Sequence, residues 1–442
     1  MENLLAITPI DGRYISKTKH LSNYFSEYAL FKYRLFVEIQ YFIELCKSLK
    51  IEINIKKIMD IYNSFNIEEC MVLKNIEKSV NHDVKSVELY LIKKFVEKSI
   101  PYYDYIHFGL TSQDINNVSI SLSLKLYIEE EFYKNIQKIL NNLDTKYKNW
   151  KNIIMLSRTH GQPAVPSSIG KELYVFHYRI NKELNNLKEI KYYSKFGGAV
   201  GNFNAHMIAY PEIDWCEFGN NFLKKLNLYR SEYTTQIDNY ENLSIIFDNV
   251  KRINTVLVDM CRDIWHYISI EYFKQKFDSN EVGSSTMPHK INPINFENAE
   301  GNLLLSISLL EFLSRKLPIS RLQRDLTDST ILRNLGLVFG YCEIAYHNLL
   351  IGLDKLEPNK DKIETDLNNN SIVLTEGIQT ILRKYGDDKA YDKLKDFCRN
   401  NDKKDMFDIK TFIENLDVEE HIKEELNNLD INNYIGYLND KN

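Results

Sequence analysis

Residues 297–316 have the sequence Glu-Asn-Ala-Glu-Gly-Asn-Leu-Leu-Leu-Ser-Ile-Ser-Leu-Leu-Glu-Phe-Leu-Ser-Arg-Lys, and this stretch decides the fold. Between Leu303 and Leu310 it carries apolar or small side chains on every side of a helix. A helix that is apolar around most of its circumference must be buried on all sides. The stretch therefore predicts a helix inside a bundle rather than a helix on a protein surface.

Four further stretches show the apolar periodicity of long helices. One opens with the capping box Thr111–Asp114 and continues toward Lys148, and the others cover residues 167–195, 243–272 and 330–356. These stretches lack the Gly and Pro residues that separate the elements of a βαβ protein. Five long helices are most simply buried when they pack together and against helices of other subunits. The sequence therefore predicts an all-α protein.

The chain is expected to form more than one domain, because 442 residues exceed what one compact core usually holds. Residues 1–101 are predicted to form an N-terminal helical domain that carries site loops. Residues 102–353 are predicted to form the central long-helix domain. Residues 354–442 are predicted to form a charged, helical C-terminal domain, in which the sequence shows no chemistry.

Composition excludes several classes of protein. A net charge of −5 argues against a general nucleic-acid binder, and the chain has no apolar run of the ~18 residues that a membrane span needs. The stretch from Met1 to Leu5 is too short and too acidic for a secretory signal. The six cysteines lack metal-type spacing and are expected to be reduced thiols. These features predict a cytoplasmic protein that meets neither nucleic acid nor membrane.

The connectors between the helices collect basic side chains although the net charge is negative. Such a set predicts a small polyanionic substrate that carries carboxylates or phosphate. The sequence contains no P-loop, no dinucleotide fingerprint, and no HExxH or CxxC motif. The basic side chains are Arg13, His82, His160, His289, Lys290, Arg321, Arg324 and Arg333.

Two of these basic residues also have plainer interpretations. Arg13 and Tyr14 lie in a turn that would equally suit a protein surface. His82 follows Asn81 and precedes Asp83 at a helix start, where a side chain that caps the helix is more common than a site residue.

Residues 283–293 form a polar segment between two helices, with the sequence Gly-Ser-Ser-Thr-Met-Pro-His-Lys-Ile-Asn-Pro. Its plainer interpretation is an ordinary loop. A β-elimination, however, needs a base, positive charge for the carbanion, and an acid for the leaving group. Ser284 suits the base if Lys290 and a nest of loop amides stabilise its oxyanion. His160 suits the acid, and Glu297 is a candidate partner for its imidazolium.

The pattern Ser-Ser-x-x-x-Pro-x-Lys-x-Asn in this segment resembles the signature of the fumarase/aspartase superfamily, whose members expel fumarate by β-elimination. Other segments narrow the resemblance to the adenylosuccinate lyase family, of the kind found in many bacteria, over nearly the whole chain. These segments occur in the family's order and cover residues 9–14, 81–85, 107–117, 157–164, 198–202, 233–237 and 320–334.

The resemblance implies a three-domain, all-α fold with a central long-helix bundle at the core of a homotetramer. It implies cleavage of adenylosuccinate to AMP and fumarate, and of the succinyl-aminoimidazole-carboxamide ribotide (SAICAR) to AICAR and fumarate. It implies that Ser284 is the general base, that His160 is the general acid, and that Glu297 supports the acid. It implies no metal and no organic cofactor, and sites that each take residues from three subunits.

The resemblance also implies a set of substrate-binding residues, with the arginines at the phosphate of the nucleotide. They are Arg13, Tyr14, Asn81, His82, Asp83, Thr111, Ser112, Gln236, Ser285, Lys290, Ile291, Asn292, Asn298, Arg324, Ser329, Thr330, Ile331, Leu332 and Arg333.

Two other functions stay open at this point. A sister activity, such as that of argininosuccinate lyase or fumarase, would use the same superfamily signature, although the arginines between 321 and 333 suit a phosphate better. The second alternative is a structural protein that keeps the fold, as lens proteins of this superfamily do. Loss of Ser284 or His160 would favour it, and both residues are present.

Overall fold

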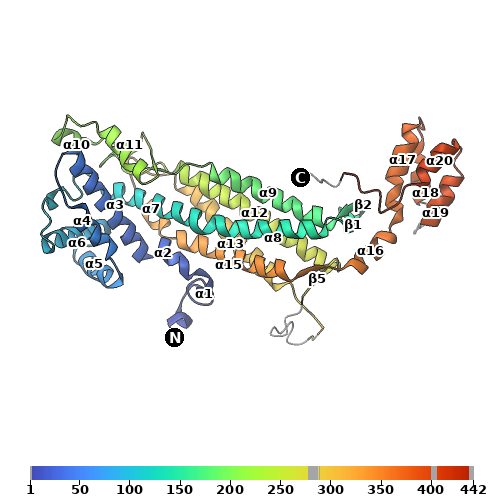
Figure 1. Ribbon diagram of the computed structural model, residues 1–442, viewed down its shortest axis with the longest axis horizontal. Helices are drawn as coiled ribbons and strands as arrows, with labels where there is room; N and C mark the ends of the chain where they lie inside the picture. The colour runs from blue at the N-terminus through green and yellow to red at the C-terminus, as the bar shows by residue number, and fades with distance from the viewer. Residues whose placement is uncertain (1, 277–286, 288, 400–405, 438–442) are drawn as a thin grey trace. The chain divides into compact units, whose positions relative to one another are not determined.

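The structure, a computed structural model, describes residues 2–276, 287, 289–399 and 406–437 (Figure 1). The chain divides into two compact units. The boundaries of these units differ from those of the three predicted domains, whose division stays a prediction. The first unit holds Met1–Gln137, Lys182–Val258 and Ala299–His347, and the second holds Lys138–Asn181, Asp259–Asn298 and Asn348–Asn442.

The predicted long helices are present and the all-α prediction is confirmed (Figure 1). The stretch toward Lys148 forms α7 (Ser112–Tyr127) and α8 (Tyr133–Trp150), joined by a π-helical turn at Ile128–Phe132. The last long helix starts later than predicted, because the short α14 (Thr327–Leu332) precedes it. The remaining long helices are α9 (Ile169–Lys188), α12 (Glu241–Ser269), α13 (Ile294–Lys316) and α15 (Leu335–Lys355).

The described residues also include three small two-stranded sheets that the sequence did not predict. β1 (Ile154–Thr159) and β2 (Gln162–Ser168) form an antiparallel hairpin, and this is why α9 begins at Ile169 rather than at Ser167. The other pairs are β3 (Tyr193–Ser194) with β4 (Tyr229–Arg230), which are parallel, and β5 (Phe273–Gln275) with β6 (Leu356–Pro358), which are antiparallel.

The first unit has an apolar core between its N-terminal helices. Phe31, Leu35 and Phe42 from α3 (Glu27–Ser48) pack with Val87 and Phe95 from α6 (Asp83–Glu97). Because α3 also packs against α7, the start of α6 and the start of α7 belong to one packed group. The other short helices of this unit are α1 (Ile15–Thr18), α2 (Ser22–Phe25), α4 (Ile55–Asn63), α5 (Ile67–Val80), α10 (Asn204–Ala209) and α11 (Trp215–Lys225).

The second unit contains the C-terminal helices, which have a core of their own that includes Ile378, Leu382, Leu394 and Ile409. A separate buried cluster joins Leu156 of β1 to Leu367, Leu374 and Ile431. The hairpin is therefore built onto the C-terminal part of the chain. The helices of this part are α16 (Lys360–Asn368), α17 (Thr375–Lys384), α18 (Ala390–Arg399), α19 (Met406–Glu414) and α20 (Glu420–Asn427).

The apolar helix α13 is only partly buried within one chain. Leu303 and Leu310 are fully buried, but Leu304, Leu305 and Phe312 are 40%, 50% and 43% exposed. The single chain therefore leaves one side of α13 uncovered, and the burial of that side by other subunits stays a prediction.

None of the described helices is long and apolar enough to cross a membrane.

A buried ion pair lies at the start of α7. Lys195 donates from Nζ to Oδ1 of Asp114 at 2.7 Å, and neither side chain is exposed. Asp114 also accepts the backbone N–H groups of Thr111, Gly197 and Gly198 at distances of 2.8 to 3.1 Å. Burial lowers the pKa of Lys195, and attraction to Asp114 opposes that shift. The pair ties the capping box of α7 to the glycine-containing segment after Lys195.

We expect Lys195→Met to destabilise the fold by about 3–5 kcal/mol, because it leaves the carboxylate of Asp114 buried without its counter-charge. Chemical denaturation followed by circular dichroism measures this change. Lys182→Met is the control, since Lys182 is an exposed lysine of α9 and its loss should change stability by less than about 0.5 kcal/mol. Equal, small effects of the two substitutions would contradict a structural role for the pair.

Candidate active site

The predicted residues at the start of α6 serve as caps in the structure. Asn81 ends α5 in the left-handed conformation, with a φ of 50°, and turns the chain into α6. His82 caps α6, since its Nδ1 accepts a hydrogen bond from the backbone N–H of Lys85 at 3.1 Å. The capping interpretation is therefore confirmed. Capping uses only Nδ1, so Nε2 remains available and lies 3.5 Å from Oγ of Ser112, the first residue of α7.

The third residue of this group, Asp83, lies between two arginines. Its Oδ2 accepts from Nη2 of Arg34 at 2.7 Å and from Nη2 of Arg333 at 2.8 Å. Arg34 is 3% exposed and also donates from Nε to Oδ1 of Asn116 at 2.8 Å. Burial alone would raise the pKa of Asp83, but the charges of Arg34 and Arg333 outweigh it and hold the pKa below its ordinary value. The carboxylate of Asp83 thus forms ion pairs with two guanidinium groups.

A second arginine network surrounds Ser329. Arg324 donates from Nη1 to Oε1 of Gln236 at 3.1 Å and from Nη2 to Oγ of Ser329 at 3.3 Å. Gln113 of α7 donates to the same hydroxyl at 3.4 Å. The Nε of Arg324 is buried and has no hydrogen-bond partner among the described residues. A buried guanidinium N–H without a partner favours an anion, such as a phosphate or carboxylate, as its missing acceptor.

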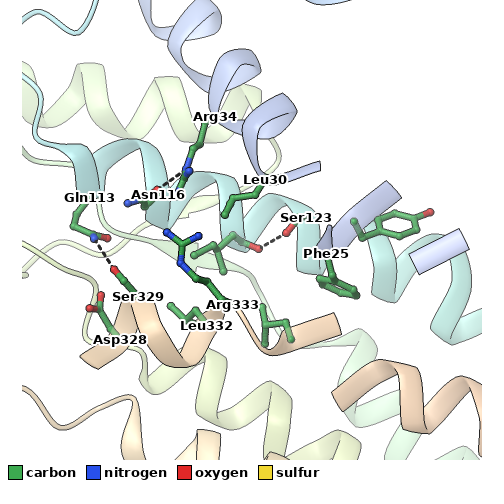
Figure 2. A pocket seen from close by; sticks show the side chains of 13 residues that line it. Phe25, Leu30, Arg34, Gln113, Asn116, Ser123, Asp328, Ser329, Leu332 and Arg333 are labelled. Atoms are coloured by element: carbon green, nitrogen blue, oxygen red, sulfur yellow. Dashed lines mark hydrogen bonds between the residues drawn. The ribbon is translucent and has the colours of Figure 1, made fainter. Parts of the chain in front are cut away.

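These two networks meet at a small cavity of about 50 Å³ (Figure 2). Figure 2 shows the side chains of Arg34 and Arg333 extending toward each other, with Gln113 directed at Ser329. Leu332 is buried and lines the cavity, whereas the neighbouring Thr330 is exposed and Ile331 is half-buried. The predicted residues 329–333 therefore reach the cavity through Ser329, Leu332 and Arg333.

The predicted turn at Arg13 and Tyr14 is confirmed. The backbone N–H of Tyr14 donates to the carbonyl of Pro9 at 2.8 Å, and the Arg13 guanidinium carbon lies 5.8 Å from the centre of the Tyr14 ring. A cleft of about 340 Å³ is lined by neighbours of this turn, Asp11 among them, and by Arg333. The turn and Arg333 therefore belong to one region of the first unit.

His160 lies at the tip of the β1–β2 hairpin in the second unit. His160 and Gly161 are the two residues of the turn, with φ values of 53° and 75°. Positive φ at both positions is typical of the tight turns that suit the twist of a hairpin, and glycine adopts it freely while histidine does so at a cost. The turn exposes the imidazole of His160 to solvent.

The described residues after the serine-containing segment also lie in the second unit. Lys290 is exposed, and the carbonyl of Ile291 accepts from Nε2 of Gln275 at 3.2 Å. Asn292 is half-buried and precedes α13, while Asn298 within that helix accepts from Nδ2 of Asn348 at 2.8 Å. Ser284 and Ser285 lie outside the described residues.

Glu297 does not contact His160 within the described part of a single chain. Its Oε1 accepts a hydrogen bond from the indole Nε1–H of Trp265 at 3.0 Å. The pairing of His160 with Glu297 therefore stays a prediction.

The arrangement in the first unit suits recognition of an anion. Arg34, Arg324 and Arg333 bring three guanidinium groups together with hydroxyl and amide side chains, and Asp83 is the carboxylate that binds two of them. The sequence alone did not identify Arg34, Asn116 or Gln113. Their signal was weak, since Gln113 and Asn116 are two of several buried polar residues in α7, and Arg34 is a single arginine within the apolar pattern of α3. Among the described residues, no three His, Cys, Asp or Glu side chains are grouped to hold a metal ion.

We expect Asp83→Asn to destabilise the protein by about 3 kcal/mol at neutral pH, because Arg34 would remain buried without its counter-charge. The folded-state pKa of Asp83 is lowered, so its contribution is present above the ordinary value of 3.8 and is lost as the pH falls through the lowered value. Urea unfolding at several pH values should show the difference from wild type shrinking below about pH 4. A pH-independent difference would contradict this account, and Asp104→Asn, at an exposed carboxylate, is the control.

Solved structures of low sequence identity share this fold. A fumarate lyase from Mesorhizobium sp. BNC1 is 16% identical, with a TM-score of 0.72 and coverage of 95% of both chains. The β-carboxy-cis,cis-muconate cycloisomerase from Acinetobacter calcoaceticus is 15% identical, with a TM-score of 0.69 and coverage of 96% of this chain and 97% of that one. At such identities the likeness concerns the fold alone.

Two family models match most of the chain, and a curated relative matches it over its full length. A model described as Lyase matches residues 12–304, and one described as Adenylosuccinate lyase C-terminal matches residues 320–435. The adenylosuccinate lyase of Dictyostelium discoideum is 49% identical, across 100% of this chain and 98% of that protein. The adenylosuccinate lyase of Escherichia coli K12 is 44% identical, across 99% of this chain and 97% of that protein. The chain is a lyase that belongs to the adenylosuccinate lyase family of the fumarase/aspartase superfamily.

Proposed function

We propose that the chain cleaves adenylosuccinate to AMP and fumarate, and SAICAR to AICAR and fumarate, in purine nucleotide synthesis. The observation that carries this proposal is the 49% identity, over the full length, to a curated adenylosuccinate lyase. The arginines around Asp83 and Ser329 support it, because both substrates carry a phosphate that needs guanidinium donors.

The reaction breaks one C–H bond and one C–N bond of the succinyl group and forms the double bond of fumarate. In our proposal Ser284 removes the proton from carbon, and His160 donates a proton to the nitrogen that leaves. Lys290 and the amides of its loop stabilise the oxyanion of Ser284, so that this otherwise weak base can act. Glu297 supports the imidazolium of His160. The exposed position of His160 at a hairpin tip supports this role, since an acid must reach a bound substrate.

The remaining predicted residues bind the two halves of the substrate. Arg13, Tyr14, Arg324, Ser329 and Arg333 bind the nucleotide, with the arginines at its phosphate. Asn81, His82 and Asp83 line the site, and residues 330–332 complete its wall. The succinyl group and its neighbours are held by Thr111, Ser112, Gln236, Ser285, Lys290, Ile291, Asn292 and Asn298.

We also infer that the protein is a homotetramer whose sites combine residues of three subunits. The uncovered side of α13 at Leu304, Leu305 and Phe312 supports this inference, because apolar side chains of a central helix need a cover. The six cysteines form no disulfide in the described part of the chain, which supports a cytoplasmic location.

Fumarate release from purified protein is the direct test of the activity. Adenylosuccinate and SAICAR are supplied separately, and release from both is the expected result. Release from adenylosuccinate alone would restrict the function to AMP formation. Release from neither, with an intact oligomer, would contradict the proposal and favour a sister lyase or a structural role.

We expect Ser284→Ala to lower turnover by about 10²–10⁴-fold while leaving substrate affinity within a few-fold of wild type, because the base acts only in the chemical step. Turnover is measured by fumarate release, and affinity by titration of the inactive variant. Ser269→Ala, at an exposed helix end, is the control and should retain wild-type turnover. Near-normal turnover of Ser284→Ala would remove Ser284 as the base.

A mixture of the inactive His160→Ala and Ser284→Ala proteins should recover part of the activity. In a shared site, some mixed tetramers contain one site with both residues intact, because the two residues come from different subunits. The measurement compares fumarate release before and after subunit exchange, with mixing verified by mass spectrometry. Absence of recovery in verified mixed tetramers would contradict the shared-site arrangement.

A further inference from the structure

The imidazole of His160 is not held by its immediate surroundings. His160 and Gly161 are both exposed, and a Cβ atom added at Gly161 would meet no atom within 4 Å. Among the described residues, no side chain is hydrogen-bonded to the imidazole of His160. The position of the ring therefore depends on the two strands and on the structure to which they are attached.

The base of the hairpin is attached by apolar packing. Leu156 of β1 is buried in a cluster with Leu367 of α16, Leu374 and Ile431. This contact fixes the lower part of β1 on the C-terminal part of the chain. It does not reach the tip, because the pairing register of the two strands shifts between Leu156 and Arg158. A shift of this kind bends the strand beyond it and changes the direction of its side chains.

The tip of the hairpin is attached by an ion pair. Arg158 lies two residues before His160, and its Nη2 is 3.6 Å from Oδ2 of Asp366 in α16. The other terminal nitrogen, Nη1, donates a long hydrogen bond of 3.5 Å to the carbonyl of Gly161. Nζ of Lys362 donates to Oδ1 of Asp366 at 2.9 Å and keeps the carboxylate directed at the hairpin. Arg158 thus connects the turn itself to α16.

The surroundings of the pair leave the tip little other support. A cavity of about 790 Å³ is lined by Arg158, Gly161 and Asp366, together with Tyr267 of α12. Burial raises the pKa of Tyr272 to about 12. The charges of Asp366 and Arg158 act on this pKa in opposite directions, because Tyr272 lies next to the pair. The Arg158 and Asp366 side chains are 31% and 17% exposed, so water screens their attraction only in part.

We propose that Asp366, acting through Arg158, is a positioning residue for the general acid His160. The proposal rests on the function proposed above, in which His160 protonates the leaving nitrogen. It gives the C-terminal part of the chain a role in the reaction although Asp366 does not touch the substrate. A proton donor must lie within hydrogen-bond reach of the atom it protonates, and a displacement of about 1 Å can cost about 10²-fold in rate.

The test compares steady-state kinetics of the full-length protein and its variants with adenylosuccinate. Asp366→Asn keeps the size of the side chain and removes its charge, and we expect kcat to fall about 10- to 100-fold with KM within about threefold of wild type. Glu364→Gln is the matched control, because it removes an exposed carboxylate from the same helix and should leave both constants unchanged. Circular dichroism and the oligomeric state of each variant establish that it is folded.

A charge exchange provides the second measurement. Arg158→Asp combined with Asp366→Arg restores an ion pair of opposite direction, and the double variant should regain at least about tenfold in kcat over Asp366→Arg alone. A loss caused by the other contact of Asp366, its hydrogen bond with Lys362, would not be reversed in this way. Values of kcat within twofold of wild type in Asp366→Asn, or no recovery in the folded double variant, would overturn the proposal.

His160→Ala separates failure of this proposal from failure of the proposed function. If His160→Ala retains turnover, His160 is not the acid and the function assigned to it is wrong. If His160→Ala loses turnover while Asp366→Asn does not, the acid is correct and its positioning by Asp366 is wrong.

Discussion

The first unit depends on the buried carboxylate of Asp114. It receives the ammonium of Lys195 and three backbone N–H groups, and it has no contact with solvent. Through these bonds it fixes the first turn of α7, where Thr111 and Ser112 lie, against the segment from Gly197 to Gly201. Burial of this carboxylate without the charge of Lys195 would be strongly unfavourable. The structure at the start of α7 therefore depends on the pair.

The segment from Gly197 to Gly201 also contacts the part of the chain that leads to Gln236. Gly201 has a φ of +88°, and a Cβ atom there would lie 2.3 Å from the carbonyl oxygen of Thr234. Only glycine allows so close an approach of two backbones. Thr234 precedes Gln236, whose backbone N–H donates to the carbonyl of Gln323 and whose side chain accepts from Arg324. A chain of backbone contacts therefore leads from Asp114 to the second arginine network.

Local signals in the sequence predicted much of this arrangement. They could not predict contacts between residues that lie far apart in the chain. The capping box at Thr111, the cap at His82 and the long helices follow from neighbouring residues, and the structure contains all of them. Arg34 lies in an apolar helix, and its partner Asp83 is 49 residues away, so no local pattern marks it. The hairpin was missed because its turn is His160–Gly161 rather than the usual Asn-Gly, and because Pro163 and Pro166 argue against a strand. The C-terminal helices show no chemistry in sequence because their contribution lies in packing and in one ion pair.

The π-helical turn at Ile128–Phe132 affects which insertions and deletions this region of the chain tolerates. A π turn contains one residue more than an α turn and absorbs the rotation of about 100° that this residue would add, so the apolar patterns of α7 and α8 are offset by one residue. Removing one residue from the π turn would convert it to a regular α turn, and the buried side of α8, which carries Ile136, Ile139, Leu140 and Leu143, would keep its direction. A deletion of one residue elsewhere in residues 112–150 would instead rotate every later side chain by about 100° and turn the buried side of the helix outward. In this family a deletion of one residue should therefore be tolerated at the π turn and be far rarer in the rest of these two helices.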